Sequence, residues 1–169
     1  APAFSLGEVD LRETLGKENA IVAGARCTLK TAVRNKGVPN ALGRLTHAVR
    51  AVDGELRRLC YSASDNIDAF IFLISDGMDL LGLFCFPKQY LMKEGCLIDR
   101  EKGGKTCIML YPPARNVTKR FAEFAEGQDR FYIDCSSGKA SNDDILRFKH
   151  LLDGAKAARS ESHCATKIA

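Results

Sequence analysis

The sequence has 169 residues, of which 46% are hydrophobic and 27% are charged, and its formal net charge is +4 at pH 7. A chain of this length and apolar content can bury one hydrophobic core, so its composition is not that of an intrinsically disordered protein. No run of about 18 apolar residues occurs, so the sequence predicts no transmembrane helix and no membrane partner.

The first part of the chain predicts short strands and one helix. Apolar residues at 20–23 indicate a strand, and residues 26–33 alternate at period two, which is typical of a second strand. From 41 to 59, leucines and valines recur at spacings of three and four, which favours a helix. Asp53-Gly54 leaves an alternative open for that segment, namely a hairpin turn between two short strands.

The longest apolar stretches lie in the middle of the chain. Residues 67–74 and 81–88 predict the two strands of a hairpin, and a short helix is predicted over 87–94. Such runs suit strands that are buried on both faces, which requires helices on either side of the sheet. The pattern therefore predicts an α/β or α+β domain.

The last third of the chain adds two strands and two helices. In chain order they are a strand over 106–111, a helix over 117–124, a strand over 131–134 and a helix over 142–157. Ser141 is a suitable N-cap for the last helix. We expect one domain over residues 1–157, followed by a C-terminal tail over 158–169.

Cysteine usage predicts free thiols. The seven cysteines form no C-x-x-C pair, their number is odd, and several lie inside apolar strand patterns: Cys27, Cys60, Cys85, Cys96, Cys107, Cys135 and Cys164. Buried reduced thiols behave as small hydrophobic side chains. We therefore expect an intracellular, reducing compartment (cytoplasm, nucleus or organelle matrix), with no disulfide framework and no structural zinc.

Positive charge is concentrated in residues 26–58. This segment contains eight lysines and arginines but only two acidic residues, Asp53 and Glu55, which gives it a net charge of +6. Residues 1–25 have a net charge of −2. A basic segment of this kind suits a negatively charged partner, and nucleic acid is the commonest one. The alternative is a solvated face with no partner.

Two stretches resemble a known nuclease superfamily. Residues 18–22, followed by Cys27-Thr28-Leu29-Lys30-Thr31-Ala32, resemble the core of PD-(D/E)xK nucleases. Residues 61–70 and 83–87 are similar to later strands of the branch that includes group I intron homing endonucleases. Residues 82–95, with Tyr111-Pro112-Pro113, also resemble MepB-like proteins. The resemblance implies an α/β fold of the restriction-endonuclease type, with a central mixed β-sheet flanked by helices.

The resemblance also implies a degenerate active site. In such nucleases two carboxylates hold Mg²⁺, and a lysine two residues after the second acid orients the attacking water. Glu18 would then be the metal ligand and Lys30 the lysine, but Thr28 stands where the second acid belongs. A neutral hydroxyl is a poor ligand for a hard divalent cation. Asp10, Asp65 and Asp68 are possible substitute acids.

Three functions follow as expectations. The first is a non-catalytic nucleic-acid-binding protein, acting as a subunit of a larger nucleoprotein assembly, with no cofactor. The second is a Mg²⁺-dependent endonuclease that cleaves DNA or RNA, and the third is a protein–protein interaction module. For the first, the predicted phosphate contacts are six residues of the basic window 26–58: Lys30, Arg34, Lys36, Arg44, Arg57 and Arg58.

Overall fold

The computed structural model describes residues 9–11, 17, 19–34, 40–113 and 117–165, with side chains described from 17 to 159 within these ranges. Its main sheet has six strands in the order β1-β2-β3-β8-β9-β13. The strands are β1 (Val9–Leu11), β2 (Ala20–Val22), β3 (Ala25–Thr31), β8 (Ala69–Asp76), β9 (Asp79–Pro87) and β13 (Tyr132–Asp134).

The sheet is mixed, as expected. β3 and β8 run parallel, whereas the other neighbouring pairs are antiparallel. The predicted hairpin over 67–74 and 81–88 is confirmed as β8 and β9, and the predicted strands at 20–23 and 26–33 are β2 and β3. Parallel strands need a crossover connection, and here it consists of further strands.

The crossover contains the largest correction to the predicted elements. Residues 41–59 form strands instead of the predicted helix, and the open alternative of a hairpin turn at Asp53-Gly54 is the one observed. Gly54 has φ of +83°, and Asp53 accepts a hydrogen bond from the backbone N–H of Glu55 at 3.0 Å. The strands are β4 (Val33–Arg34), β5 (Ala41–Arg44), β6 (Thr46–Arg50) and β7 (Leu56–Cys60).

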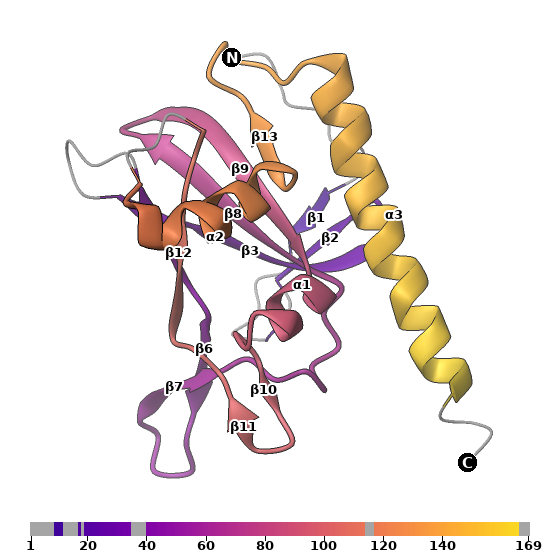
Figure 1. Ribbon diagram of the computed structural model, residues 1–169. Helices are drawn as coiled ribbons and strands as arrows, with labels where there is room; N and C mark the ends of the chain where they lie inside the picture. The colour runs from indigo at the N-terminus through magenta and orange to yellow at the C-terminus, as the bar shows by residue number, and fades with distance from the viewer. Residues whose placement is uncertain (1–8, 12–16, 18, 35–39, 114–116, 166–169) are drawn as a thin grey trace.

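These strands form two small sheets. β5 lies between β4 and β12 (Cys107–Leu110), and β6 pairs with β7 as a hairpin that projects from the main sheet at the lower left of Figure 1. A second small hairpin follows α1 and consists of β10 (Ile98–Asp99) and β11 (Lys102–Gly103). The apolar spacing over 41–59 does not mark a buried stripe, because Val52, Leu56 and Leu59 are exposed.

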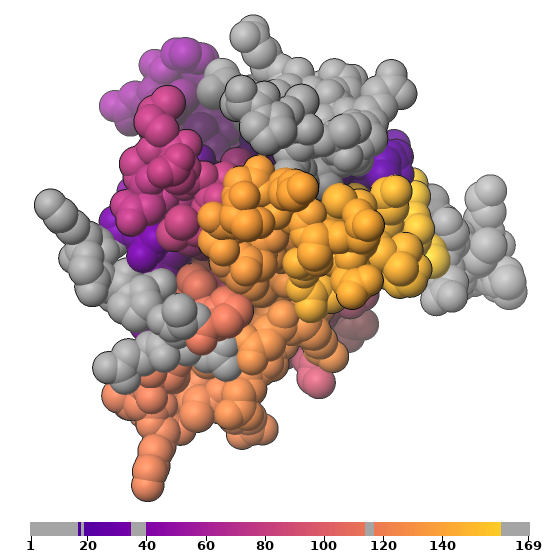
Figure 2. All heavy atoms as spheres, turned by 90° about the horizontal axis from the view of Figure 1, so that it is seen from above, coloured from indigo at the N-terminus to yellow at the C-terminus, as the bar shows by residue number. Residues whose placement is uncertain are grey.

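One face of the main sheet packs on α3 (Asn142–Ala165). Ile71, Leu83 and Cys85 from β8 and β9 contact Phe148 and Leu152 of this helix in one buried cluster. Figure 1 shows α3 crossing this side of the sheet, and Figure 2 shows it on the molecular surface in orange to yellow. Within the described residues no helix is long and apolar enough to cross a membrane.

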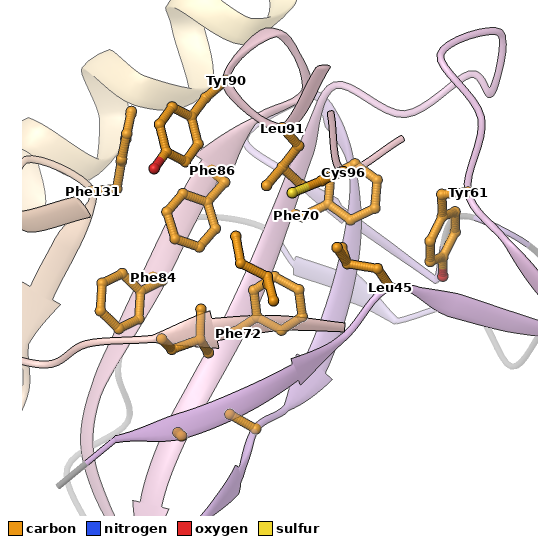
Figure 3. Packing of buried hydrophobic residues seen from close by; sticks show 14 of the residues in the cluster. Leu45, Tyr61, Phe70, Phe72, Phe84, Phe86, Tyr90, Leu91, Cys96 and Phe131 are labelled. Atoms are coloured by element: carbon orange, nitrogen blue, oxygen red, sulfur yellow. The ribbon is translucent and has the colours of Figure 1, made fainter. Parts of the chain in front are cut away.

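The other face is built from aromatic rings. Phe84 stacks on Phe86 and Phe86 stacks on Tyr90, with ring centroids 5.4 Å and 5.2 Å apart. Figure 3 shows these rings beside Phe70 and Phe72. Two helices, α1 (Lys88–Lys93) and α2 (Lys119–Asp129), cover this face together with β5 and β12. The expected helices on both faces are present, but a small sheet shares the second face.

α3 is longer than the predicted helix over 142–157. It continues to Ala165 and so includes residues that the sequence assigned to a tail over 158–169. Its start is as predicted, because the Ser141 hydroxyl accepts a hydrogen bond from the Asp144 N–H at 3.1 Å. Beyond the predicted end, Arg159 donates to the buried carboxylate of Asp68 at 2.9 Å, which ties this part of the helix to the residue before β8.

Two glycine substitutions test the packing of this core. A Cβ on Gly82 in β9 would meet the Tyr132 hydroxyl and lie 2.7 Å from the carbonyl oxygen of Ile133. We expect Gly82→Ala to lower the free energy of unfolding by about 1–3 kcal/mol in urea titrations, because a backbone oxygen cannot move aside cheaply. Gly154→Ala is the matched control. It lies in α3 with open space around its Cβ and should raise stability by about 0.5–1 kcal/mol. Equal changes in the free energy of unfolding for the two variants would contradict the tight β9–β13 contact.

Candidate functional site

Strand β3 presents Thr28 and Lys30 on one face of the sheet. Side chains alternate along a strand, and the parallel register pairs Thr28 with Phe70 and Lys30 with Phe72. Both phenylalanines belong to the aromatic core, so Thr28 and Lys30 point toward the crossover strands. The prediction that these two residues share a face of a central strand is confirmed.

Thr28 has a structural contact in place of a free hydroxyl. The side chain is 1% exposed, and its Oγ1 donates a hydrogen bond to the carbonyl oxygen of Lys17 at 2.8 Å. Asn19 reinforces this attachment, because its amide both donates to the carbonyl of Leu29 at 2.8 Å and accepts from the N–H of Leu29 at 2.6 Å. Glu18, the predicted metal ligand, lies outside the described residues.

Lys30 is half-buried and has an altered pKa. Its Nζ donates a hydrogen bond to the carbonyl oxygen of Thr46 and lies 5.0 Å from the ring centroid of Tyr61. Burial lowers the pKa of Lys30 to about 8, and repulsion from Arg58 and Arg44 lowers it further in the same direction. Three basic side chains from β3, β5 and β7 therefore lie within electrostatic reach of one another.

This Lys30 cluster, which we define as Lys30, Arg44 and Arg58, lacks compensating acids. Among the described residues, none of the three forms an ion pair with a carboxylate. Arg57, although adjacent to Arg58, pairs with Asp53 at 2.6 Å within the hairpin. Arg44 and Arg58 are exposed, so the cluster opens to solvent.

The other predicted phosphate contacts are separated from the cluster. Arg34 lies on β4, where it lines a cavity with Tyr132 at another part of the sheet. Lys36 lies outside the described residues. Of six predicted contacts, the structure thus brings together Lys30, Arg44 and Arg58.

His47 and Tyr61 are site residues that the sequence did not indicate. The two rings are 4.9 Å apart, and the His47 side chain is buried, with neither nitrogen hydrogen-bonded within the described part of the chain. Burial lowers the pKa of His47, and Lys17 adds to that effect. Burial raises the pKa of Tyr61 to about 12, against a hydrogen bond with Thr28 that lowers it. The hairpin alternative at Asp53-Gly54 could have found His47, because it places this residue on a strand beside the site.

Two of the possible substitute acids, Asp65 and Asp68, are already engaged by cations of the chain. Asp65 forms an ion pair with Lys17 and accepts the Ser62 N–H at 2.8 Å. Asp68 accepts the Arg26 N–H at 2.8 Å and pairs with Arg159. The side chain of Asp10 lies outside the described part. In the described ranges, no group of three His, Cys, Asp or Glu side chains is arranged to hold a metal ion.

Burial suppresses the reactivity of the two cysteines Cys27 and Cys135. The six whose side chains are described are free thiols. Burial raises the pKa of Cys27 to about 12 and the pKa of Cys135 to about 11, so these thiols stay protonated and unreactive at neutral pH.

The lowered pKa of Lys30 predicts a pH dependence of stability. Between pH 8 and 10.5 the unfolded chain binds more protons at this residue than the folded chain does, so stability rises across this window. We expect urea unfolding to show a gain for the wild type that Lys30→Met lacks. Lys93→Met, an exposed position at the end of α1, is the matched control and should behave as the wild type. A Lys30→Met variant with the wild-type pH profile would contradict the lowered pKa.

Comparisons with known proteins bear on the fold and the family. Among solved structures, the crystal structure of MepB matches with a TM-score of 0.57 and 15% sequence identity, over 75% of this chain and 85% of that chain. At this identity the match shows a shared fold alone. A search of curated proteins finds no match. A family model described as MepB-like matches residues 20–133, which run from β2 into β13 and include all of the Lys30 cluster. Since that match covers more than half of the sequence, the chain belongs to the MepB-like family.

Proposed function

We propose that this MepB-like protein binds nucleic acid without cleaving it, and that the Lys30 cluster contacts the phosphate backbone. The observation that carries the proposal is the clustering of three basic side chains from β3, β5 and β7, none of which is ion-paired with a carboxylate among the described residues. Burial lowers the pKa of Lys30, and repulsion from the two guanidinium groups acts in the same direction. Holding like charges together is unfavourable in the free protein. A phosphate, with its negative charge and several acceptor oxygens, would relieve that repulsion.

The β6–β7 hairpin extends this surface. It carries Arg50 and Arg57 beside exposed Leu56 and Leu59, and it stands away from the main sheet (Figure 1). Phosphate contacts by arginine position a strand without reading its sequence. The protein would therefore bind many sequences with similar affinity, as an architectural subunit of a larger nucleoprotein assembly does.

The exposed leucines favour a second function for the same hairpin. Two large apolar side chains on a projecting strand also suit contact with another protein. A protein–protein interaction module is thus the alternative. The two functions differ in their dependence on salt, because counterion release dominates binding to nucleic acid.

The endonuclease alternative is the least well supported of the three expected functions. In the proposed nuclease-like arrangement, Thr28 occupies the place of the second acid, and its hydroxyl is committed to the carbonyl of Lys17. Asp65 and Asp68 are each paired with a basic side chain. A hard divalent cation needs several oxygen ligands, most of them charged. The likeness to PD-(D/E)xK nucleases would then reflect shared architecture with a lost metal site.

A salt titration tests the proposed binding surface. Fluorescence anisotropy with labelled single-stranded RNA, single-stranded DNA and duplex DNA should show weaker binding as KCl rises. Each of Arg44→Gln and Arg58→Gln should lower the slope of log affinity against log salt by about one, equally for all sequences. Lys139→Gln, an exposed position before α3, is the charge-matched control and should leave the slope unchanged. Identical slopes and affinities in all four proteins would exclude the Lys30 cluster as a phosphate site and promote the protein-interaction alternative.

An assay for cleavage tests the absence of catalysis. We expect no Mg²⁺- or Mn²⁺-dependent cleavage of plasmid, duplex or single-stranded substrates, because one carboxylate and a threonine hold such an ion too weakly. Lys30→Met should be indistinguishable from the wild type. Cleavage products that form with the wild type and vanish with Lys30→Met would establish the endonuclease alternative instead.

A further inference from the structure

A separate cavity of about 280 Å³ lies beside the ends of β8 and β9. It is independent of the Lys30 cluster and is formed by residues from four segments of the chain. We call it the Arg34 cavity. The lining residues that matter for its chemistry are Arg34, Leu81, Pro112, Pro113, Tyr132 and Asp134.

Arg34 brings an unpaired positive group to this cavity. Its Nη1 atom is buried and has no hydrogen-bond partner in the described part of the chain. Asp134 also lines the cavity, but the two side chains form no ion pair. A buried guanidinium N–H without an acceptor is costly. The Arg34 side chain removes that cost if its guanidinium turns toward an anionic oxygen of a ligand in the cavity. The cavity therefore suits a ligand with a negative group.

The walls of the cavity suit a flat ring. Pro112, Pro113 and Leu81 are apolar, and the Tyr132 side chain is held in place by its hydroxyl, which donates to the Leu81 carbonyl at 3.3 Å. The Tyr132 ring also packs on Phe84 with centroids 5.1 Å apart. Apolar walls with a few fixed polar groups are typical of small-molecule sites, and this cavity is large enough for one heterocyclic ring.

Asp134 adds a preference for a ring that donates hydrogen bonds. One of its oxygens accepts the Ser136 N–H at 2.9 Å, and a carboxylate has further acceptor positions. The exocyclic amino group of cytosine is a good donor to a carboxylate, whereas uracil has a carbonyl at the same position.

We propose that the Arg34 cavity binds a nucleoside monophosphate whose base carries an exocyclic amino group. The base would lie between the prolines and Tyr132 with its amino group toward Asp134, and the phosphate would meet Arg34. A free nucleotide and the 5′-phosphorylated end of a strand share this chemistry. The inference does not require the proposed phosphate surface, since a single nucleotide suffices.

Calorimetric titration of the full chain tests this proposal. CMP should bind with saturation. Ribose 5-phosphate and inorganic phosphate should bind at least about tenfold more weakly, because they lack the ring, and UMP about fivefold more weakly than CMP. Arg34→Gln should weaken CMP binding by about tenfold or more, while Lys93→Gln, at an exposed position of α1, leaves it unchanged. Asp134→Asn should reduce the preference for CMP over UMP.

Two further experiments identify the source of the ligand and guard against a folding defect in Arg34→Gln. A 5′-phosphorylated oligonucleotide ending in cytidine should displace CMP if a strand end is the source, and its failure to do so would assign the cavity to free nucleotides. Pro113→Ser, at an exposed rim position, should weaken CMP binding with unchanged phosphate binding. This variant keeps the test decisive if Arg34→Gln unfolds.

Three results would overturn the proposal. They are a lack of saturable CMP binding, equal binding of CMP and ribose 5-phosphate, and wild-type affinity for CMP in folded Arg34→Gln. Loss of strand binding in Arg44→Gln and Arg58→Gln with intact CMP binding would support both proposals. If both variants bind a nucleic-acid strand with wild-type affinity and salt dependence, the proposed phosphate surface is refuted and the Arg34 cavity is not affected.

Discussion

The burial of the β8–β9 hairpin on both faces is the constraint on which the rest of this structure depends. Ile71 and Leu83 face α3, and Phe70, Phe72 and Phe86 face the opposite side. Strands that are apolar on both faces cannot be left in water. One long helix is sufficient for the first face. The second face is covered by the crossover between β3 and β8 together with α1, α2 and β12, and this cover positions the Lys30 cluster and borders the Arg34 cavity.

The two proposed binding surfaces are located where this cover meets the edge of the core. Lys30 lies beside Phe72 in the sheet register, yet its ammonium reaches the Thr46 carbonyl and the Tyr61 ring. A cation at the margin of an apolar core loses solvation, and neighbouring guanidinium groups add to the cost. The stability of the aromatic core offsets that cost, which allows the fold to keep three basic side chains together without a paired carboxylate among the described residues. Arg34, with its unpaired Nη1, shows the same principle at a second place.

Part of the candidate site could be predicted from the sequence. Alternation over 26–33 was sufficient to place Thr28 and Lys30 on one face, because period two is a property of any strand. Arg44 and Arg58 were predicted as phosphate contacts only because they belong to the basic window 26–58. His47 and Tyr61 were missed because residues 41–59 were predicted as a helix, and their proximity depends on the pairing of β6 with β7 and on the path of the chain after β7. The family resemblance to MepB-like proteins came from the hairpin and α1, not from the site.

The sequence by itself determined those elements that depend only on neighbouring residues in the chain. Continuous apolar runs determined β8 and β9, and Ser141 determined the start of α3 through its hydrogen bond to the Asp144 N–H. Tertiary structure decided the rest. A spacing of three and four over 41–59 does not reveal which side chains will be covered. Ala41 and Leu45 of this segment are buried in the aromatic cluster, whereas β6 and β7 pair with each other as a projecting hairpin. Likewise, Arg159 of α3 pairs with Asp68, which is buried and lies 91 residues away in sequence. Which charges meet is a property of the folded chain, since residues distant in sequence become neighbours only when the core has formed.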